Sequence, residues 1–175
     1  MKRRDLEHII RAAADIADDD EIIVIGSQAI LGEYPDPPAE LTVSTEADVY
    51  PKNKPDRADL IDGSIGEGSP FHAMYGYYAQ GVGAKTAVLP IGWNERLVAV
   101  RNANTRGATG WCLEAHDLVL SKYVAGREKD EHFVRAAGAA GIARKAVLLE
   151  RLGEMPIDDA FKERIRRRIL ADFGA

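Results

Sequence analysis

The chain lacks the features that mark secreted and membrane-embedded proteins. A single cysteine, Cys112, excludes an intrachain disulfide and a multi-cysteine zinc site, and it fits a protein of a reducing compartment. Apolar runs such as Ile22–Ile25 are far shorter than the roughly 20 residues of a membrane-spanning helix. Charged residues interrupt the first apolar positions and no secretory segment follows, so we expect a cytoplasmic protein with no membrane partner.

A strong excess of one charge is also missing. The 175 residues carry 23 Lys+Arg against 28 Asp+Glu, a net charge of −5, and 46% of them are hydrophobic. This composition excludes a mainly disordered chain and argues weakly against indiscriminate nucleic-acid binding. The length predicts one hydrophobic core. We expect an α/β core over residues 1–114 and a helical C-terminal part over residues 115–175, packed together as a single compact domain.

Hydrophobic patterns predict helices alternating with strands. Apolar residues at helical spacing predict a helix over Arg4–Ala17, and the β-branched run Glu21–Ile25 predicts a central strand covered on both faces. Phe71–Tyr78 fits either a helix or an extended chain. The remaining expected strands are Thr45–Tyr50, Ala87–Pro90, Leu97–Arg101 and Trp111–Leu113; the remaining helices are Gln28–Leu31, Arg57–Ile61 and three long C-terminal ones over 115–137, 142–152 and 158–173.

Two short motifs are associated with the first two strands of this pattern. Gly26 and Ser27 come directly after the buried strand, where free backbone N–H groups at a helix start favour a phosphate. Glu46 and Asp48 lie two residues apart on the next strand, so both carboxylates project from one face. Such a pair is unfavourable without a cation, and Mg²⁺ prefers oxygen ligands. The alternative is an ordinary turn glycine with two surface carboxylates.

In this order, the two motifs resemble the signature of the nucleotidyltransferase superfamily, a Gly-Ser followed by an acidic-x-acidic pair on the next strand. The resemblance implies a mixed-sheet core with flanking helices. It also implies that Gly26 and Ser27 bind the phosphates of a nucleoside triphosphate (NTP), while Glu46 and Asp48 are catalytic ligands of Mg²⁺ or Mn²⁺. Two departures stand out: 18 residues, rich in proline, separate Ser27 from Glu46, and the first acid is Glu instead of the commoner Asp.

The 15 residues that end at Asp130 form a second informative segment. On one continuous helix, Lys122, Gly126, Lys129 and Asp130 share a face, whereas Arg127 lies about 140° away from Lys122. The segment resembles the Asp-Leu … Ser-Lys … Ala-Gly-Arg-x-Lys-Asp run of the AbiEii-type toxin nucleotidyltransferases and their small relatives, including the DUF6036 group. This resemblance implies that Lys122 contacts nucleotide phosphates and that Arg127, Lys129 and a catalytic Asp130 complete the site. An internal ion pair is the alternative for Arg127.

Two questions stay open in the sequence. The superfamily often uses a third carboxylate, and its candidates here are Asp62, Glu95, Glu114 and Asp130. A basic cluster, Lys162–Arg168, is either a solvated helix face or a surface for an RNA backbone.

The expected function is Mg²⁺-dependent transfer of a nucleoside monophosphate from an NTP to an acceptor hydroxyl. The toxin resemblance implies tRNA as the acceptor and a cognate antitoxin as a partner, while other RNA, a protein or a small molecule stays open as acceptor. The alternative is a catalytically silent nucleotide- or RNA-binding module on the same fold.

Overall fold

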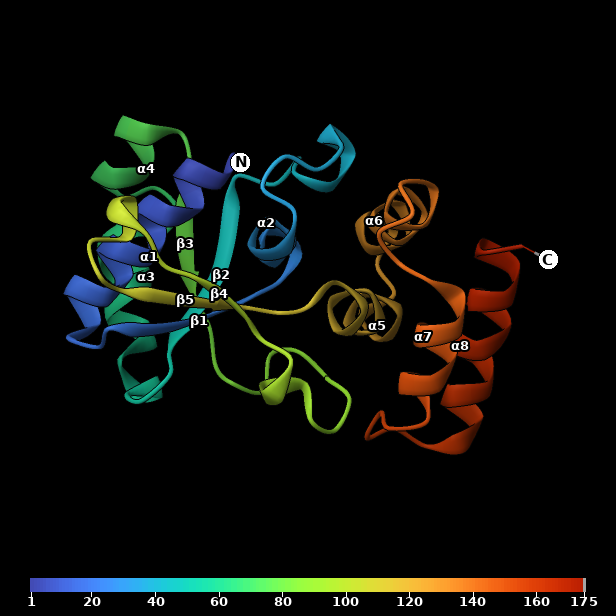
Figure 1. The fold of residues 1–175 in the computed structure, drawn as a ribbon. Coiled ribbons are helices and arrows are strands. Elements are labelled where there is room, and N and C mark those ends of the chain that lie inside the picture. Colours follow the sequence, from blue (N-terminus) through green and yellow to red (C-terminus); the bar gives the residue numbers. More distant parts are fainter. Residues whose placement is uncertain (175) are drawn as a thin grey trace.

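A five-stranded mixed sheet forms the centre of the N-terminal part in the computed structural model, which describes residues 1–174 (Figure 1). The strands are β1 (Glu21–Ile25), β2 (Glu46–Pro51), β3 (Tyr78–Gly81), β4 (Val98–Val100) and β5 (Thr109–Cys112), in the order β3-β2-β1-β5-β4. The pair β1–β2 is antiparallel, as is β4–β5, whereas β1–β5 and β2–β3 are parallel. The central β1 is buried on both faces, as its apolar run predicts.

Helices cover both faces of this sheet. The helices α1 (Arg3–Ala17) and α3 (Ala58–Ile65) pack on one face, and α2 (Ile30–Glu33) lies on the other (Figure 1). The short helix α4 (Pro70–Tyr75) follows α3. Single 3-10 turns complete this part: η1 (Ser27–Ala29), η2 (Ala39–Leu41), η3 (Pro55–Arg57), η4 (Trp93–Glu95) and η5 (Ala103–Thr105). The expected helix at Gln28–Leu31 is therefore η1 followed by α2.

Four helices form the C-terminal part. They are α5 (Ala115–Ala125), α6 (Glu128–Ala139), α7 (Lys145–Leu152) and α8 (Asp159–Asp172). Outward from α2, the layers are α5 with α6, then α7 and α8 (Figure 1). The structure confirms the predicted α/β fold, with its mixed sheet, flanking helices and helical C-terminal part. None of the helices within residues 1–174 has the length and apolar character needed to cross a membrane.

One predicted strand is wrong. Ala87–Pro90 is not a strand: it pairs with none of the five strands and belongs to the irregular chain before η4. The sheet is completed instead by β3, which the sequence analysis did not predict. The undecided segment Phe71–Tyr78 divides at Gly76, whose φ of 75° ends α4 before β3 begins.

The predicted continuous helix over residues 115–137 is also wrong. Gly126 adopts a left-handed conformation with φ 63° and ends α5, and its N–H donates to the carbonyl of Lys122. Arg127 is then the N-cap residue of α6. The two helices therefore meet at a corner, and the single helical face expected for Lys122, Gly126, Lys129 and Asp130 does not exist.

Candidate active site

The structure brings the predicted site residues of both motifs together around two adjoining cavities. The larger cavity, of about 700 Å³, is bordered by the ends of β2 and β3, by η2 and by the corner between α5 and α6. It is lined by seven of the eight predicted residues: Ser27, Glu46, Asp48, Lys122, Arg127, Lys129 and Asp130. The eighth, Gly26, lines a smaller cavity of about 130 Å³ that shares Asp48, Lys122 and Arg127 with the first.

Gly26 is required by the position of Asp48. These residues meet because β1 pairs with β2 in a register that places Ile25 opposite Asp48. A Cβ atom on Gly26 would lie 2.0 Å from Oδ2 of Asp48, well inside any allowed contact. Gly26 also has a φ of 69°, a conformation that side chains disfavour. The glycine of the first motif therefore makes room for the second acid of the next motif.

Glu46 and Asp48 form a close pair of carboxylates on one face of β2. Burial, and then the neighbouring Glu46, raise the pKa of Asp48 to about 7, while Lys122 and Lys129 act in the opposite direction. At pH 7 a fraction of the molecules therefore carries a proton on this carboxylate pair. A divalent cation bound between the two oxygen groups would take the place of that proton, so the donor chemistry fits Mg²⁺ or Mn²⁺.

Tyr78 on β3 supports this pair. In the parallel β2–β3 register, Tyr78 lies opposite Glu46, and its hydroxyl donates to Oε2 of Glu46 at 2.9 Å. Burial and this hydrogen bond raise the pKa of Tyr78 to about 12, so the phenol stays a donor at neutral pH. Sequence reasoning missed Tyr78 because β3 is too short for a visible period-2 pattern.

The corner between α5 and α6 carries the cationic side of the larger cavity. Nζ of Lys122 lies 3.1 Å from Oδ1 of Asp130, and Nε of Arg127 donates to Oδ2 of Asp130 at 2.7 Å. Asp130 is 1% exposed. Burial alone would raise its pKa, but the bonds from Arg127 and Lys122 outweigh burial and lower it. Asp130 is therefore an anion shared by two cations.

The other candidates for a third carboxylate lie elsewhere. Glu114 is the N-cap residue of α5 and pairs with His116 and Arg151. Asp62 on α3 and Glu95 on η4 are exposed, and neither lines the two cavities. Within residues 1–174 no group of three or more His, Cys, Asp or Glu side chains is placed to hold a metal ion. A cation here would thus take two protein carboxylates and complete its shell from water and phosphate oxygens.

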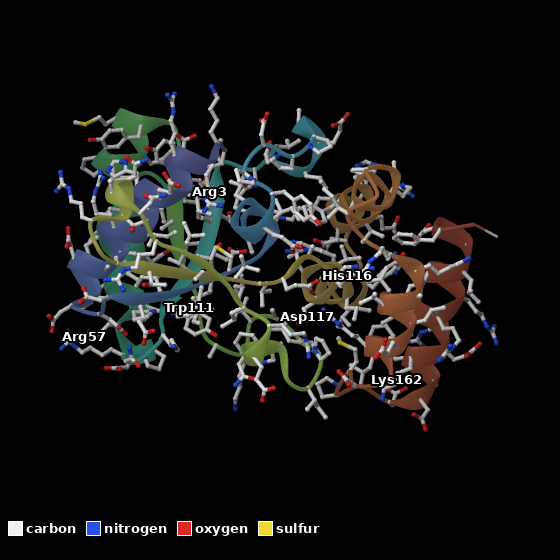
Figure 2. The ribbon with its side chains drawn as sticks, viewed as in Figure 1. Arg3, Arg57, Trp111, His116, Asp117 and Lys162 are labelled. Atoms are coloured by element: carbon white, nitrogen blue, oxygen red, sulfur yellow. The ribbon has the colours of Figure 1, made fainter. Side chains whose placement is uncertain are left out.

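The basic cluster at Lys162–Arg168 lies on α8 and does not line the cavities. Figure 2 places Lys162 on the outer helix layer, and α8 contributes no residue to either cavity lining within the described chain. Arg167 pairs with Glu163 at 3.1 Å, and Arg168 pairs with Glu131 at 3.0 Å. This arrangement fits the solvated-face interpretation of the cluster.

A comparison with known families agrees with this geometry. A model described as "Nucleotidyltransferase of unknown function (DUF6036)" matches residues 4–167. The chain belongs to this family. The match confirms the predicted relation to the small DUF6036 group, whereas the likeness to AbiEii-type toxins stays a prediction. Neither the curated proteins nor the solved structures include a significant match to the chain.

Proposed function

We propose that this member of the DUF6036 family is a Mg²⁺-dependent nucleotidyltransferase that moves a nucleoside monophosphate from an NTP to an acceptor hydroxyl. The observation that carries the proposal is the composition of one cavity. A carboxylate pair, Glu46 and Asp48, lines it together with Lys122, Arg127 and Lys129. Oxygen ligands for a cation beside cations for phosphates are the two requirements of phosphoryl transfer.

In this proposal the protein acts by positioning and by charge. Glu46 and Asp48 hold Mg²⁺ or Mn²⁺, which when bound neutralises charge on the triphosphate. Lys122, Arg127 and Lys129 balance the negative charge that develops as the acceptor oxygen bonds to the α-phosphorus and pyrophosphate leaves.

Three further residues complete the proposed site. Gly26 lets the backbone approach the phosphates of the NTP closely. The hydroxyl of Ser27, at the cavity wall, adds a hydrogen-bond donor for these phosphates. Asp130 acts here as a positioning residue, since it holds Lys122 and Arg127 in one arrangement.

The likeness to AbiEii-type toxins makes tRNA the first acceptor to test and a cognate antitoxin the first partner. The net charge of −5 does not oppose an RNA acceptor, because the cavity itself carries cations. Growth arrest on expression, relieved by the product of an adjacent gene, would support the toxin role. Harmless expression of an active enzyme would favour another acceptor.

The proposal is tested by incubating the protein with each labelled NTP, Mg²⁺ and total tRNA. Transfer should be lost on chelation and should fall on the order of 100-fold or more in Glu46→Gln and Asp48→Asn. Glu95→Gln is the matched control, because Glu95 is exposed and lies outside both cavities. Full transfer by both site variants would contradict the proposed mechanism.

A catalytically silent nucleotide- or RNA-binding module is the second candidate function. One observation favours it: Glu46 and Asp48 converge in the cavity, while Asp130, which also lines it, is already paired with Lys122 and Arg127. NTP binding without incorporation into any acceptor would support this candidate.

A further inference from the structure

The segment between the two motifs contributes side chains of its own to the larger cavity. We call residues 34–45 the insert loop; it makes up most of the long gap between Ser27 and Glu46. Its 3-10 turn η2 packs against α6, and Leu41 is 1% exposed at that contact. The insert loop thus lines the larger cavity and contacts the C-terminal helices.

The lining of the larger cavity combines charged groups with apolar and aromatic ones. The charged groups are the carboxylate pair, the cations of the α5–α6 corner and Glu40 of the insert loop. The apolar and aromatic groups are Leu41 and Val43 of the insert loop and His132 and Phe133 of α6, with the centroid of the Phe133 ring 5.8 Å from Nζ of Lys122. Leu41 and Phe133 are buried and support the wall, whereas Val43 is 79% exposed although it lines the cavity. Val43 therefore offers an apolar surface that the protein's own packing does not use.

We infer that the insert loop and α6 form a nucleobase subsite, in which the base of an NTP lies against Val43 and the ring of His132. This inference rests on the proposed function and adds the place of the base to it. The reason is chemical complementarity: the triphosphate belongs against the cations, and the flat, largely apolar face of a base belongs against apolar and aromatic groups. A volume of about 700 Å³ is sufficient for both parts of one nucleotide.

The test compares nucleotide binding with binding of the phosphate chain alone. Isothermal titration calorimetry with Mg²⁺ is carried out with ATP, GTP, CTP and UTP, and separately with inorganic tripolyphosphate. Val43→Ala should weaken the best-bound NTP about fivefold and leave tripolyphosphate within twofold. Val43→Ile, which retains the apolar surface, should bind like the wild type. Ile91→Ala is the matched control, because Ile91 is 73% exposed and lies outside both cavities.

The outcomes separate this inference from the function on which it rests. Unchanged NTP affinity in Val43→Ala overturns the subsite alone. Equal losses for NTP and tripolyphosphate also overturn it, because the loop would then act on the phosphates. If the wild type binds no NTP, the proposed function fails and the subsite fails with it.

Discussion

Gly26 leaves open the space that the carboxylate of Asp48 occupies. A methyl group there would meet Oδ2 of Asp48 at 2.0 Å and would also be strained at φ 69°. Gly26→Ala should therefore destabilise the protein by about 1–3 kcal/mol, measured by urea unfolding, and should displace Asp48 so that Mn²⁺ binding is lost.

The matched control for this change is Gly63→Ala. Gly63 lies inside α3, and a Cβ there meets nothing within 4 Å. The free energy of unfolding of this variant should equal that of the wild type or exceed it by up to about 1 kcal/mol, because alanine is the better helix former. A Gly26→Ala protein as stable as Gly63→Ala, with normal Mn²⁺ binding, would contradict the contact with Asp48.

Asp48 should make metal binding depend on pH near neutrality. Its pKa is raised from 3.8 to about 7 in the folded protein, so the metal-free fold takes up a proton that the unfolded chain releases. Stability without metal should thus decline as pH rises from about 4 to about 7. The affinity for Mn²⁺ should rise over the upper part of this range and level off above pH 7, because the cation competes with the proton.

This dependence can be measured by titrating Mn²⁺ and following its EPR signal between pH 5.5 and 8.5. Asp48→Asn removes the titrating group, so any residual affinity should lose its rise towards pH 7. A wild-type affinity that is flat across the same interval would contradict an Asp48 that has a raised pKa and binds the cation.

At the scale of elements, the corner between α5 and α6 assembles the cationic side of the site. Gly126 ends one helix in a left-handed conformation, and Arg127 begins the next as its N-cap residue. Because of this turn, Arg127 and Lys122 both form ion pairs with the carboxylate of Asp130, although their side chains would point apart on a continuous helix. The break in the helix is therefore what allows both cations to line one cavity.

Asp130→Asn should loosen this corner. The change removes the charge from a buried carboxylate that binds two cations. It should lower the free energy of unfolding, measured in urea, by about 2 kcal/mol or more. Tripolyphosphate should also bind more weakly, because Lys122 and Arg127 lose their common anchor.

Glu163→Gln on α8 is the control for Asp130→Asn. Glu163 pairs with Arg166 and Arg167 at the surface, where such pairs contribute little to stability. The free energy of unfolding should therefore change by no more than about 0.5 kcal/mol. Equal, small effects in the two variants would show that Asp130 does not stabilise the corner.

For the whole molecule, a network of ion pairs joins the C-terminal helices to the core. Asp117 accepts from Arg96 at 2.8 Å and from Arg151 at 2.9 Å, and Arg151 also pairs with Glu114. His116 completes the network, and Figure 2 shows it with Asp117 between the sheet and the outer helices. These contacts connect the chain before β4, the start of α5 and the helix α7.

This network should make the fold sensitive to acid. Burial alone would raise the pKa of Glu114, but the bonds from His116 and Arg151 lower it from 4.5 to about 2. Its stabilising contribution is thus complete above about pH 4.5 and is lost as pH falls towards 2. The contribution amounts to at most about 3 kcal/mol. Glu114→Gln should flatten this part of the stability curve, measured by urea unfolding at pH 2–6, whereas Glu95→Gln should not.

Much of the fold follows from local patterns. The apolar run of β1, the helical spacing of α1 and the glycines that follow α6 and α7 predict these elements from neighbouring residues alone, whereas the break at Gly126 is not predicted. Short elements escape such reasoning. β3 has four residues and forms because β2 offers it a partner, while Ala87–Pro90 has a strand-like composition but no partner strand.

The local sequence accounts for which chemical groups this protein has available: a glycine and a serine after a buried strand, two acids on the next strand, and three cations near Gly126. Their distances depend on contacts between residues far apart in the chain. Strand register places Asp48 over Gly26, the helix corner turns Lys122 and Arg127 towards Asp130, and the packing of η2 on α6 brings Val43 to the cavity. Pairing and packing energies act between distant segments, so no local pattern carries them.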